Sequence, residues 1–347
     1  MNSERISVLI PMYNTEDYIE ECLRSVAGQT YPDFECVIVD DGSSDLSLQR
    51  ADAFAQKDHR FRIIRQEHAG VAQAIVNGIE NAKGQWLYFL DSDDWIDPDE
   101  LQYLYTLVTE NRCDMIASDY LIETDHPESC SIVRFQGVVE KAGFSRLFYP
   151  QFLCNDRYTG IVCGNTRGGK LVRKTLAQNN MVLQKDMRFA EDAILMLGIL
   201  CDCDRVYGAQ DHAGYHYRKH HNSSMHNYGI SYAAHRAVYA QRIRELYREK
   251  GIDGEPLLER NYLQFELYNI LGSMFDIGFD MKALERQYPE IGIQMMETVE
   301  KLSRTDKRMF SLRNNLILWM LKHRLYPVLT VLYKVNHWLR YTLKLSR

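Results

Sequence analysis

The sequence predicts an α/β protein in which a doubly wound, mostly parallel sheet is followed by a C-terminal α-helical region. Two observations predict this fold. Short apolar runs typical of strands alternate with segments of about 10–15 residues whose apolar side chains recur at helical spacing. Such alternation is typical of parallel sheets, because consecutive parallel strands are joined by crossover helices. From about residue 227 onward the patterns are helical alone.

The strands are expected where apolar runs end in proline, glycine or acidic residues. They cover residues 6–10, 34–39, 61–65, 86–90 and 115–120. Helices are expected over 19–26, 48–55, 71–82 and 101–108, and later over 235–250 and 259–275. Gly28 and Gly84 follow the first and third helices, as expected of residues that end a helix.

An acidic cluster follows the fourth strand, which runs directly into Asp91, Asp93 and Asp94. Ligands of open α/β sheets bind at the carboxyl ends of strands. Two carboxylates at D-x-D spacing can converge on one hard cation, and Mg²⁺ or Mn²⁺ held in this way keeps positions for substrate phosphates. The alternative is a solvated acidic turn before the next helix. A second acidic pair, Asp40-Asp41, ends the second strand at the equivalent place.

Two common nucleotide-binding classes lack their motifs. No G-x-G-x-x-G follows the first strand, which argues against a dinucleotide-binding Rossmann fold. Gly168-Gly169-Lys170 is followed by Leu171 rather than Ser or Thr, so the phosphate-binding loop of Walker-type NTPases is missing as well.

Three motifs carry a resemblance to a known family. Val8–Asn14, Val39–Asp45 and Phe89–Asp94, in this order and spacing, resemble the nucleotide-sugar-binding half of family 2 glycosyltransferases of the GT-A fold. Three later segments are similar to the family's N-K-L-Y-R, E-D and Y-x-Y-R…S motifs. These segments are residues 169–173, 188–192 and 215–223.

The resemblance also predicts a division of the chain. A GT-A catalytic domain would cover residues 1–226, with a nucleotide-sugar half at about 1–120 and an acceptor half at about 121–226. A helical C-terminal region would follow over residues 227–347 and end in a basic amphipathic tail over 304–347.

The resemblance implies a donor site and a metal site. The predicted donor-binding residues are Pro11, Tyr13, Asn14, Asp40, Asp41, Asp91, Lys170 and Arg218. Asp40 would accept a hydrogen bond from uracil and Asp41 would support its loop. Asp91 and Asp93 would contact the ribose and a divalent metal, Mn²⁺ or Mg²⁺, which neutralises the diphosphate leaving group. His216 is a further candidate metal ligand, with His220 and His221 nearby. The alternative for Arg218 is an ordinary surface residue.

The implied catalytic residues are Asp192 and Glu191. Asp192 would be the general base that takes the proton from the acceptor hydroxyl as it attacks and inverts the anomeric carbon. Glu191 would orient the acceptor. The alternative for Asp192 is a helix N-terminal acid, which the helix dipole favours, because an apolar segment follows it.

One position departs from the family pattern. Ile75-Val76 stands where many members carry Arg-Asn, so a cation near the donor is lost. Arg65 and Lys170 are the candidates that we expect to replace it. His68 stands where an asparagine is common.

Composition and charge limit the partners. The net charge of −6 disfavours nucleic acid as a partner. The eight cysteines lack metal-finger spacing and are expected to be reduced thiols of a cytoplasmic protein. Neither a signal peptide nor a membrane-spanning helix is expected. The sequence does not determine the oligomeric state, and an oligomer is possible.

The tail has the opposite charge. Residues 304–347 contain ten lysines and arginines and one acid, Asp306, a net charge of +9. Basic residues with tryptophan and tyrosine on an amphipathic helix are typical of a peripheral membrane anchor, here on the inner face of the cell membrane, with a lipid-linked acceptor. The alternative is a helical appendage packed on the catalytic domain.

The sequence thus predicts an inverting, metal-dependent glycosyltransferase. It would move a sugar from a nucleotide-diphosphate donor, a UDP-sugar, to a hydroxyl of a growing surface glycan or glycolipid. A nucleotidyltransferase and a non-catalytic nucleotide-sugar-binding scaffold subunit are the alternatives.

Overall fold

The computed structural model describes most of the chain. It covers residues 4–123, 128–130, 133, 135–148, 166–181, 187, 190–210, 212–219, 230–276, 286, 289–306, 308, 310 and 312–332. His220, His221 and the tail beyond residue 332 lie outside the described residues.

The first strands of the main sheet form where the sequence predicts them. They are β1 (Ile6–Met12), β2 (Phe34–Asp40), β3 (Phe61–Arg65), β4 (Trp86–Phe89) and β6 (Met115–Ser118). β1 lies between β2 and β4, β3 follows β2 at the edge, and all of these pairings are parallel. The carboxyl ends of β1, β2 and β4 therefore meet at one edge of the sheet.

Three later strands complete this sheet, in the order β3-β2-β1-β4-β10-β6-β11-β9. They are β9 (Gly137–Glu140), β10 (Lys170–Arg173) and β11 (Arg205–Ala209). β10 is antiparallel to both of its neighbours, β4 and β6. Because β10 lies between β4 and β6, the turn before β10 is next to the end of β4. The predicted acidic cluster begins at this end.

A second, smaller sheet has the order β5-β12-β7-β8. Its strands are β5 (Trp95–Ile96), β12 (Tyr215–Arg218), β7 (Tyr120–Glu123) and β8 (Glu128–Cys130). Because β5 directly follows the acidic cluster and β12 pairs with it, this sheet joins the D-x-D segment to the Y-x-Y-R segment.

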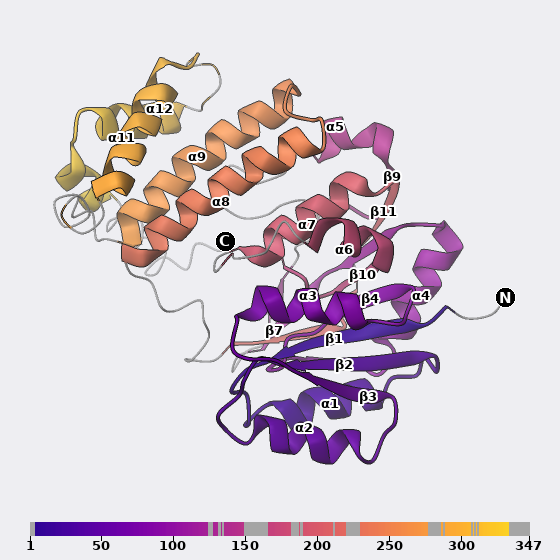
Figure 1. Cartoon of the computed structure of the whole chain (residues 1–347). Helices are drawn as coiled ribbons and strands as arrows, with labels where there is room; N and C mark the ends of the chain where they lie inside the picture. The colour runs from indigo at the N-terminus through magenta and orange to yellow at the C-terminus, as the bar shows by residue number, and fades with distance from the viewer. Residues whose placement is uncertain are drawn as a thin grey trace.

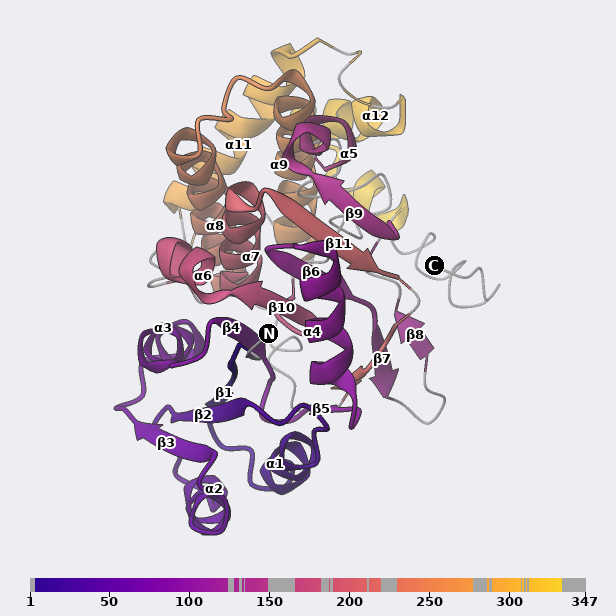
Figure 2. The same cartoon turned by 90° about the vertical axis from the view of Figure 1, so that its right-hand side faces the viewer.

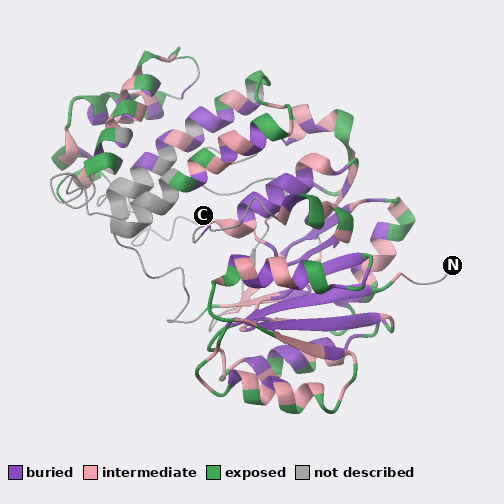
Figure 3. Ribbon diagram, in the orientation of Figure 1, coloured by how far each residue is buried: buried purple, intermediate pink, exposed green. Residues whose placement is uncertain are grey.

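Helices cover both faces of the main sheet (Figures 1 and 2). α1 (Ile19–Ala27), α2 (Ser47–Ala55) and α4 (Glu100–Asn111) pack on one face, and α3 (Val71–Asn81), α6 (Lys174–Asn180) and α7 (Glu191–Asp202) on the other. Alternate residues of β1 show this division, since Val8 and Ile10 face the first group and Leu9 the second. The inner strands β1, β2 and β4 are buried along their whole length, whereas the edge strand β3 is partly exposed (Figure 3). The doubly wound, mostly parallel fold is confirmed. The short helices η1 (Lys141–Gly143) and α5 (Phe144–Leu147) follow β9.

The C-terminal helices form two layers beyond α7 (Figure 1). They are α8 (Ile230–Glu249), α9 (Pro256–Asp276), α11 (Pro289–Arg304) and α12 (Leu312–Lys322). α8 and α9 share a hydrophobic core with α7, whereas α11, α12 and one side of α9 form a separate cluster. The helical region is confirmed, and the domain division at residue 226 stays a prediction.

Within the described residues, Cys22, Cys36, Cys113, Cys201 and Cys203 are thiols that form no disulfide. No described helix has the length and apolar character to cross a bilayer.

Candidate active site

An aromatic platform lies at the ends of β1 and β3. Tyr13, which follows β1, is 44% exposed and stacks on His68, with ring centroids 4.2 Å apart. Pro11 is buried within β1, beside Val39 of β2. Tyr13 and His68 therefore offer an exposed flat surface beside the buried carboxylate Asp40.

Hydrogen bonds tie the loop after β1 to the loop after β2. Asn14 adopts a left-handed backbone conformation, with φ of 51°. Its amide N–H donates to Ser43 Oγ at 3.1 Å, and its Oδ1 accepts from Ser44 N–H at 2.8 Å. Asp40 Oδ1 accepts from Ser43 N–H at 3.3 Å. The two loops are thus held together, with Asp40 at their junction.

Asp41 shapes a third loop. Its carboxylate accepts hydrogen bonds from Gln66 Nε2 at 2.6 Å, Ala69 N–H at 2.8 Å and Gly70 N–H at 2.9 Å. Asp41 is buried, and its partners span the loop that carries His68 into α3. This arrangement suits the predicted supporting role of Asp41.

The acidic loop after β4 is held by β12. The Tyr215 hydroxyl donates to Asp94 Oδ2 at 2.5 Å and accepts from Asp91 N–H at 3.3 Å. Arg218 donates from its backbone N–H to Asp94 Oδ1 at 2.8 Å and from Nε to the Asp93 carbonyl at 2.9 Å. Burial, with Asp91 and Asp93 adding to it, raises the pKa of Asp94 to about 8. Asp94 therefore anchors the loop, and the Asp91 carboxylate stays 41% exposed.

Three predicted residues have other contacts in this structure. Lys170 is fully buried, and its Nζ donates to the carbonyls of Thr166 at 2.6 Å and Gly168 at 3.3 Å. The His216 ring nitrogens lie 2.7 Å from Glu123 and 3.1 Å from Asp97. The guanidinium of Arg218 lies over the Trp95 ring, 4.3 Å from its centroid. Their roles toward a donor or a metal stay predictions.

The carboxylates fit a hard cation that is shared with a substrate. Within the described ranges, no group of three or more His, Cys, Asp or Glu side chains is arranged to hold a metal ion. Mg²⁺ and Mn²⁺ sites that serve phosphates need only one or two protein carboxylates, because phosphate oxygens and water complete the coordination. The exposed carboxylate of Asp91 suits such a site, with Asp93 as the second candidate ligand.

The predicted catalytic pair begins α7. Ala190, in the left-handed conformation with φ of 54°, turns the chain so that Glu191 and Asp192 occupy the first turn. Asp192 Oδ1 accepts from Ala193 N–H at 2.8 Å. Burial and, to a smaller extent, the neighbouring Glu191 raise the pKa of Asp192 to about 7, although Arg167 opposes the rise. A carboxylate with a pKa near neutrality is suited to general base chemistry.

Arg167 is the residue that sequence reasoning missed. Its side chain is only 7% exposed and forms ion pairs with Asp91 at 3.2 Å and Glu191 at 3.3 Å. Burial acts to lower the pKa of Arg167, but the carboxylates around it raise the pKa above its usual value. The only signal in the sequence was a cation three residues before Lys170, in a glycine-containing turn.

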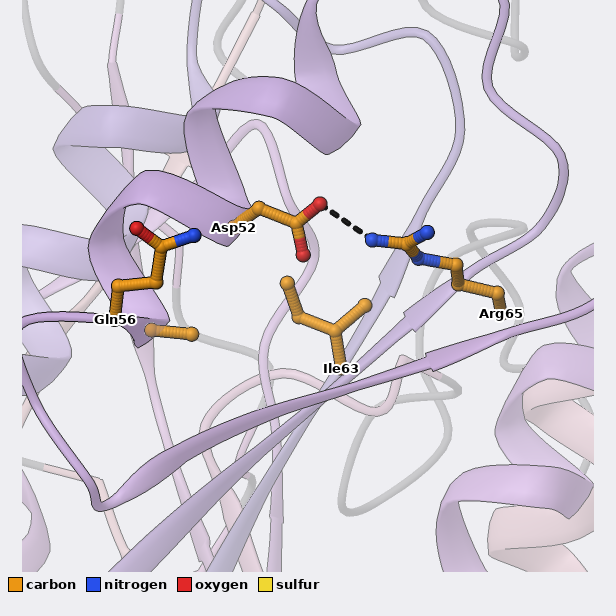
Figure 4. A pocket seen from close by; sticks show the side chains of 5 residues that line it. Asp52, Gln56, Ile63 and Arg65 are labelled. Atoms are coloured by element: carbon orange, nitrogen blue, oxygen red, sulfur yellow. Dashed lines mark hydrogen bonds and ion pairs between the residues drawn. The ribbon is translucent and has the colours of Figure 1, made fainter.

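An open hollow of about 590 Å³ lies elsewhere, between α2 and the edge strand β3. It is lined by Asp52, Ala55, Gln56, Ile63 and Arg65. Figure 4 shows Asp52 and Arg65 facing each other and joined by an ion pair. Arg65, one candidate for the missing donor cation, is thus paired away from the acidic loop, and the hollow contains none of the predicted site residues.

The chain is similar to several known proteins. The family model described as "Glycosyl transferase family 2" matches residues 7–180. Glycosyltransferase GlyA of Streptococcus pneumoniae is 40% identical over 117 residues, which are 34% of this chain and only 17% of GlyA. The putative glycosyltransferase EpsH of Bacillus subtilis is 27% identical over 345 residues, 94% of each chain.

A solved structure shares the fold over nearly the whole length. The crystal structure of S. aureus TarS 1–349 in complex with UDP superposes with a TM-score of 0.67 at 19% identity. The superposition covers 96% of this chain and 92% of that one. With the match of the family model over half of the sequence, the chain belongs to glycosyl transferase family 2 and is a glycosyltransferase.

Proposed function

We propose that this protein is an inverting, metal-dependent glycosyltransferase that uses a UDP-sugar and extends a surface glycan. One observation carries the proposal. The acidic loop after β4 and the acidic pair on α7 are far apart in sequence, yet one buried guanidinium contacts both, at 3.2 and 3.3 Å. These contacts support a single site in which Asp91 would bind the donor and Asp192, next to Glu191, would act as the base.

The proposed reaction needs one base and one leaving group. Asp192 accepts the proton of the acceptor hydroxyl as the hydroxyl oxygen bonds to the anomeric carbon. The bond from that carbon to the diphosphate oxygen breaks on the opposite face, so the configuration inverts and the nucleoside diphosphate leaves. A divalent cation at Asp91 and Asp93 would neutralise the charge on the diphosphate. Glu191 orients the acceptor beside Asp192.

The donor base would lie on the platform after β1. Tyr13 supplies an aromatic face for stacking, and Asp40 an acceptor for a ring N–H, as uracil requires. The likeness to a structure that holds UDP supports uridine as the base.

The alternatives predict different binding. A nucleotidyltransferase needs a glycine-rich, basic first loop for a triphosphate, and residues 11–14 are neither. A scaffold subunit without turnover is favoured only by Ile75-Val76.

Calorimetric titration tests the donor class. The purified protein would be titrated with uridine, guanosine, cytidine and thymidine diphosphates, each with and without Mn²⁺. We expect UDP to bind tightly only with Mn²⁺, after which UDP-sugars are screened for release of UDP. Binding of none of the four would contradict the proposal, and binding without turnover would favour the scaffold subunit.

We also propose that the acceptor is lipid-linked and that α12 rests on the inner face of the cell membrane. Leu312 is 91% exposed and Trp319 is 51% exposed, and Leu316 lies between them at helical spacing. The sequence from residue 307 onward contains nine lysines and arginines and no acid. An anionic lipid surface complements both features, at about 1 kcal/mol for each cation near it.

Vesicle sedimentation tests this contact. The protein should sediment with phosphatidylglycerol vesicles and not with phosphatidylcholine vesicles. Replacing Leu312, Leu316 and Trp319 by serine should release it. Leu46→Ser is the control, because Leu46 is a similarly exposed side chain in the catalytic half. Unchanged sedimentation of the triple variant would contradict the contact.

A further inference from the structure

The turn that carries Arg167 is fixed from several sides. Lys170 Nζ binds two of its carbonyls, and Ser118 donates to the Gly169 carbonyl from N–H at 2.8 Å and from Oγ at 3.0 Å. At Gly168 a Cβ would lie 2.7 Å from the Tyr215 ring, so glycine is required there. The guanidinium is therefore placed by the fold before any ligand binds.

Arg167 is the cation shared by both acidic groups. Nη2 donates to Asp91 Oδ1 and Nη1 to Glu191 Oε1, and these residues come from the end of β4 and the start of α7. The Nε of Arg167 is buried without a hydrogen-bond partner among the residues that the structure describes. Removing one partner of a buried ion pair is costly, because the remaining charge is left uncompensated. The positions of Asp91 and Glu191 are therefore linked.

The other candidate cations have different partners among the described residues. Arg65 pairs with Asp52, and Lys170 donates to backbone carbonyls within its own turn. Arg167 thus supplies positive charge in a chain that has Ile75-Val76 in place of Arg-Asn.

We propose that Arg167 is a positioning residue that couples donor binding at Asp91 to the catalytic pair on α7. This inference rests on the proposed function. Asp91 is held by Arg167 in the free protein and is partly released when a cation and a diphosphate engage it. The guanidinium then pairs more closely with Glu191 and fixes the first turn of α7, which carries Asp192.

A double-mutant cycle on nucleotide affinity tests the coupling without any transfer assay. The probe is UDP with Mn²⁺, titrated by calorimetry. In Glu191→Gln the Arg167 guanidinium pairs with Asp91 alone, so this ion pair becomes stronger. The nucleotide and its cation must then compete with Arg167 for the Asp91 carboxylate. We expect affinity to fall about three- to tenfold, as coupled neighbours do. In the Arg167→Ala background the same substitution should change affinity very little. Equal effects in both backgrounds would refute the coupling.

A kinetic readout separates positioning from mere support. Arg167→Ala should lower kcat on the order of 100-fold with a smaller change in the KM for donor, because misplaced groups lose rate rather than binding. Guanidinium ion, added below unfolding concentrations, should restore part of kcat, and sodium chloride at equal ionic strength should not. A fall in donor affinity alone, or absence of rescue, would overturn the positioning role.

Matched variants address folding and the proposed function itself. Arg205→Ala is the control, because Arg205 also pairs with a glutamate, at 2.6 Å, and has a buried Nε without a partner within the described residues. Arg205→Ala should keep the kcat of the unaltered protein, and added guanidinium ion should not raise this kcat. If Arg167→Ala does not fold, Arg167→Lys takes its place in the cycle, since a lysine cannot bridge two carboxylates in the same way. Failure of the unaltered protein to bind UDP–Mn²⁺ would contradict the proposed function at the first step.

Discussion

Asp41, after β2, is buried and Asp192, in the first turn of α7, is partly buried, and the two carboxylates have different partners. Asp41 accepts three hydrogen bonds from one loop. Asp192 accepts one from the next residue in its own helix and lies beside a second acid. The comparison teaches that hydrogen bonds hold one carboxylate in a loop-shaping position, whereas at α7 burial and a neighbouring acid raise the pKa of the other, as the proposed base requires.

Asp192→Asn should have the largest effect. An amide cannot take the proton of the acceptor, so turnover should fall by about 10²- to 10⁴-fold. The affinity for UDP–Mn²⁺ should stay the same, because Asp192 contacts no donor loop in the described structure. Release of UDP from the donor and calorimetric titration measure the two quantities.

Asp202→Asn is the matched control for that prediction. Asp202 is the last residue of α7 and pairs with Lys250 at 2.6 Å, away from Asp91. Its variant should keep its turnover. Full transfer by Asp192→Asn would disprove the assignment of the base.

Asp41→Ala should instead damage binding. The loop at 66–70 loses three hydrogen bonds to Asp41, and a typical hydrogen bond contributes about 0.5–1.5 kcal/mol. The loop carries His68, the stacking partner of Tyr13. We expect UDP–Mn²⁺ affinity to fall by at least about tenfold, or about 1.4 kcal/mol. Asp58→Ala is the control, because Asp58 pairs with Arg60 in a loop outside the site. Equal losses in both variants would mean that stability, not loop shape, determines affinity.

The parts of the structure that the sequence predicts are those formed by contacts between residues close together in the chain. Strands β1 to β4 and helices α1 to α4 were predictable because strand and helix periodicity is encoded within each segment. The placement of β10 between β4 and β6 was not, because sheet order depends on long-range pairing. Arg167 was missed for the same reason, since its partners lie 76 and 24 residues away. The second sheet was missed because its strands are short.

The pH dependence should follow Asp192. Its pKa of about 7 means that protonated, inactive enzyme accumulates below neutrality. Where Asp192 controls the rate, kcat/KM should therefore rise tenfold per pH unit up to about pH 7 and then level off. A rate that is independent of pH between 5 and 7 would contradict this assignment.

The raised pKa of Asp192 should also make the stability of the fold fall with rising pH, in the opposite direction to activity. The pKa of Asp192 is raised on folding, so its contribution to stability is complete below 3.8, the value in the unfolded chain, and is lost as pH rises through about 7. Asp192→Asn should therefore raise the melting temperature more at pH 8 than at pH 4. Thermal unfolding at the two pH values measures the difference, and an equal shift at both would show that Asp192 ionises normally.

The smallest expected effect concerns Ala190, whose left-handed backbone begins α7. A non-glycine residue in this conformation costs about 1 kcal/mol, which Ala190→Gly should relieve. Arg112, with φ of 52° at the end of α4, has the same strain outside the site. Arg112→Gly should therefore give a similar rise in melting temperature with unchanged turnover. If the first turn of α7 needs the stiffness of alanine to hold Asp192, only Ala190→Gly should lower kcat, by a few-fold. Equal kcat in both variants would mean that Arg167 and the helix are sufficient to position the base.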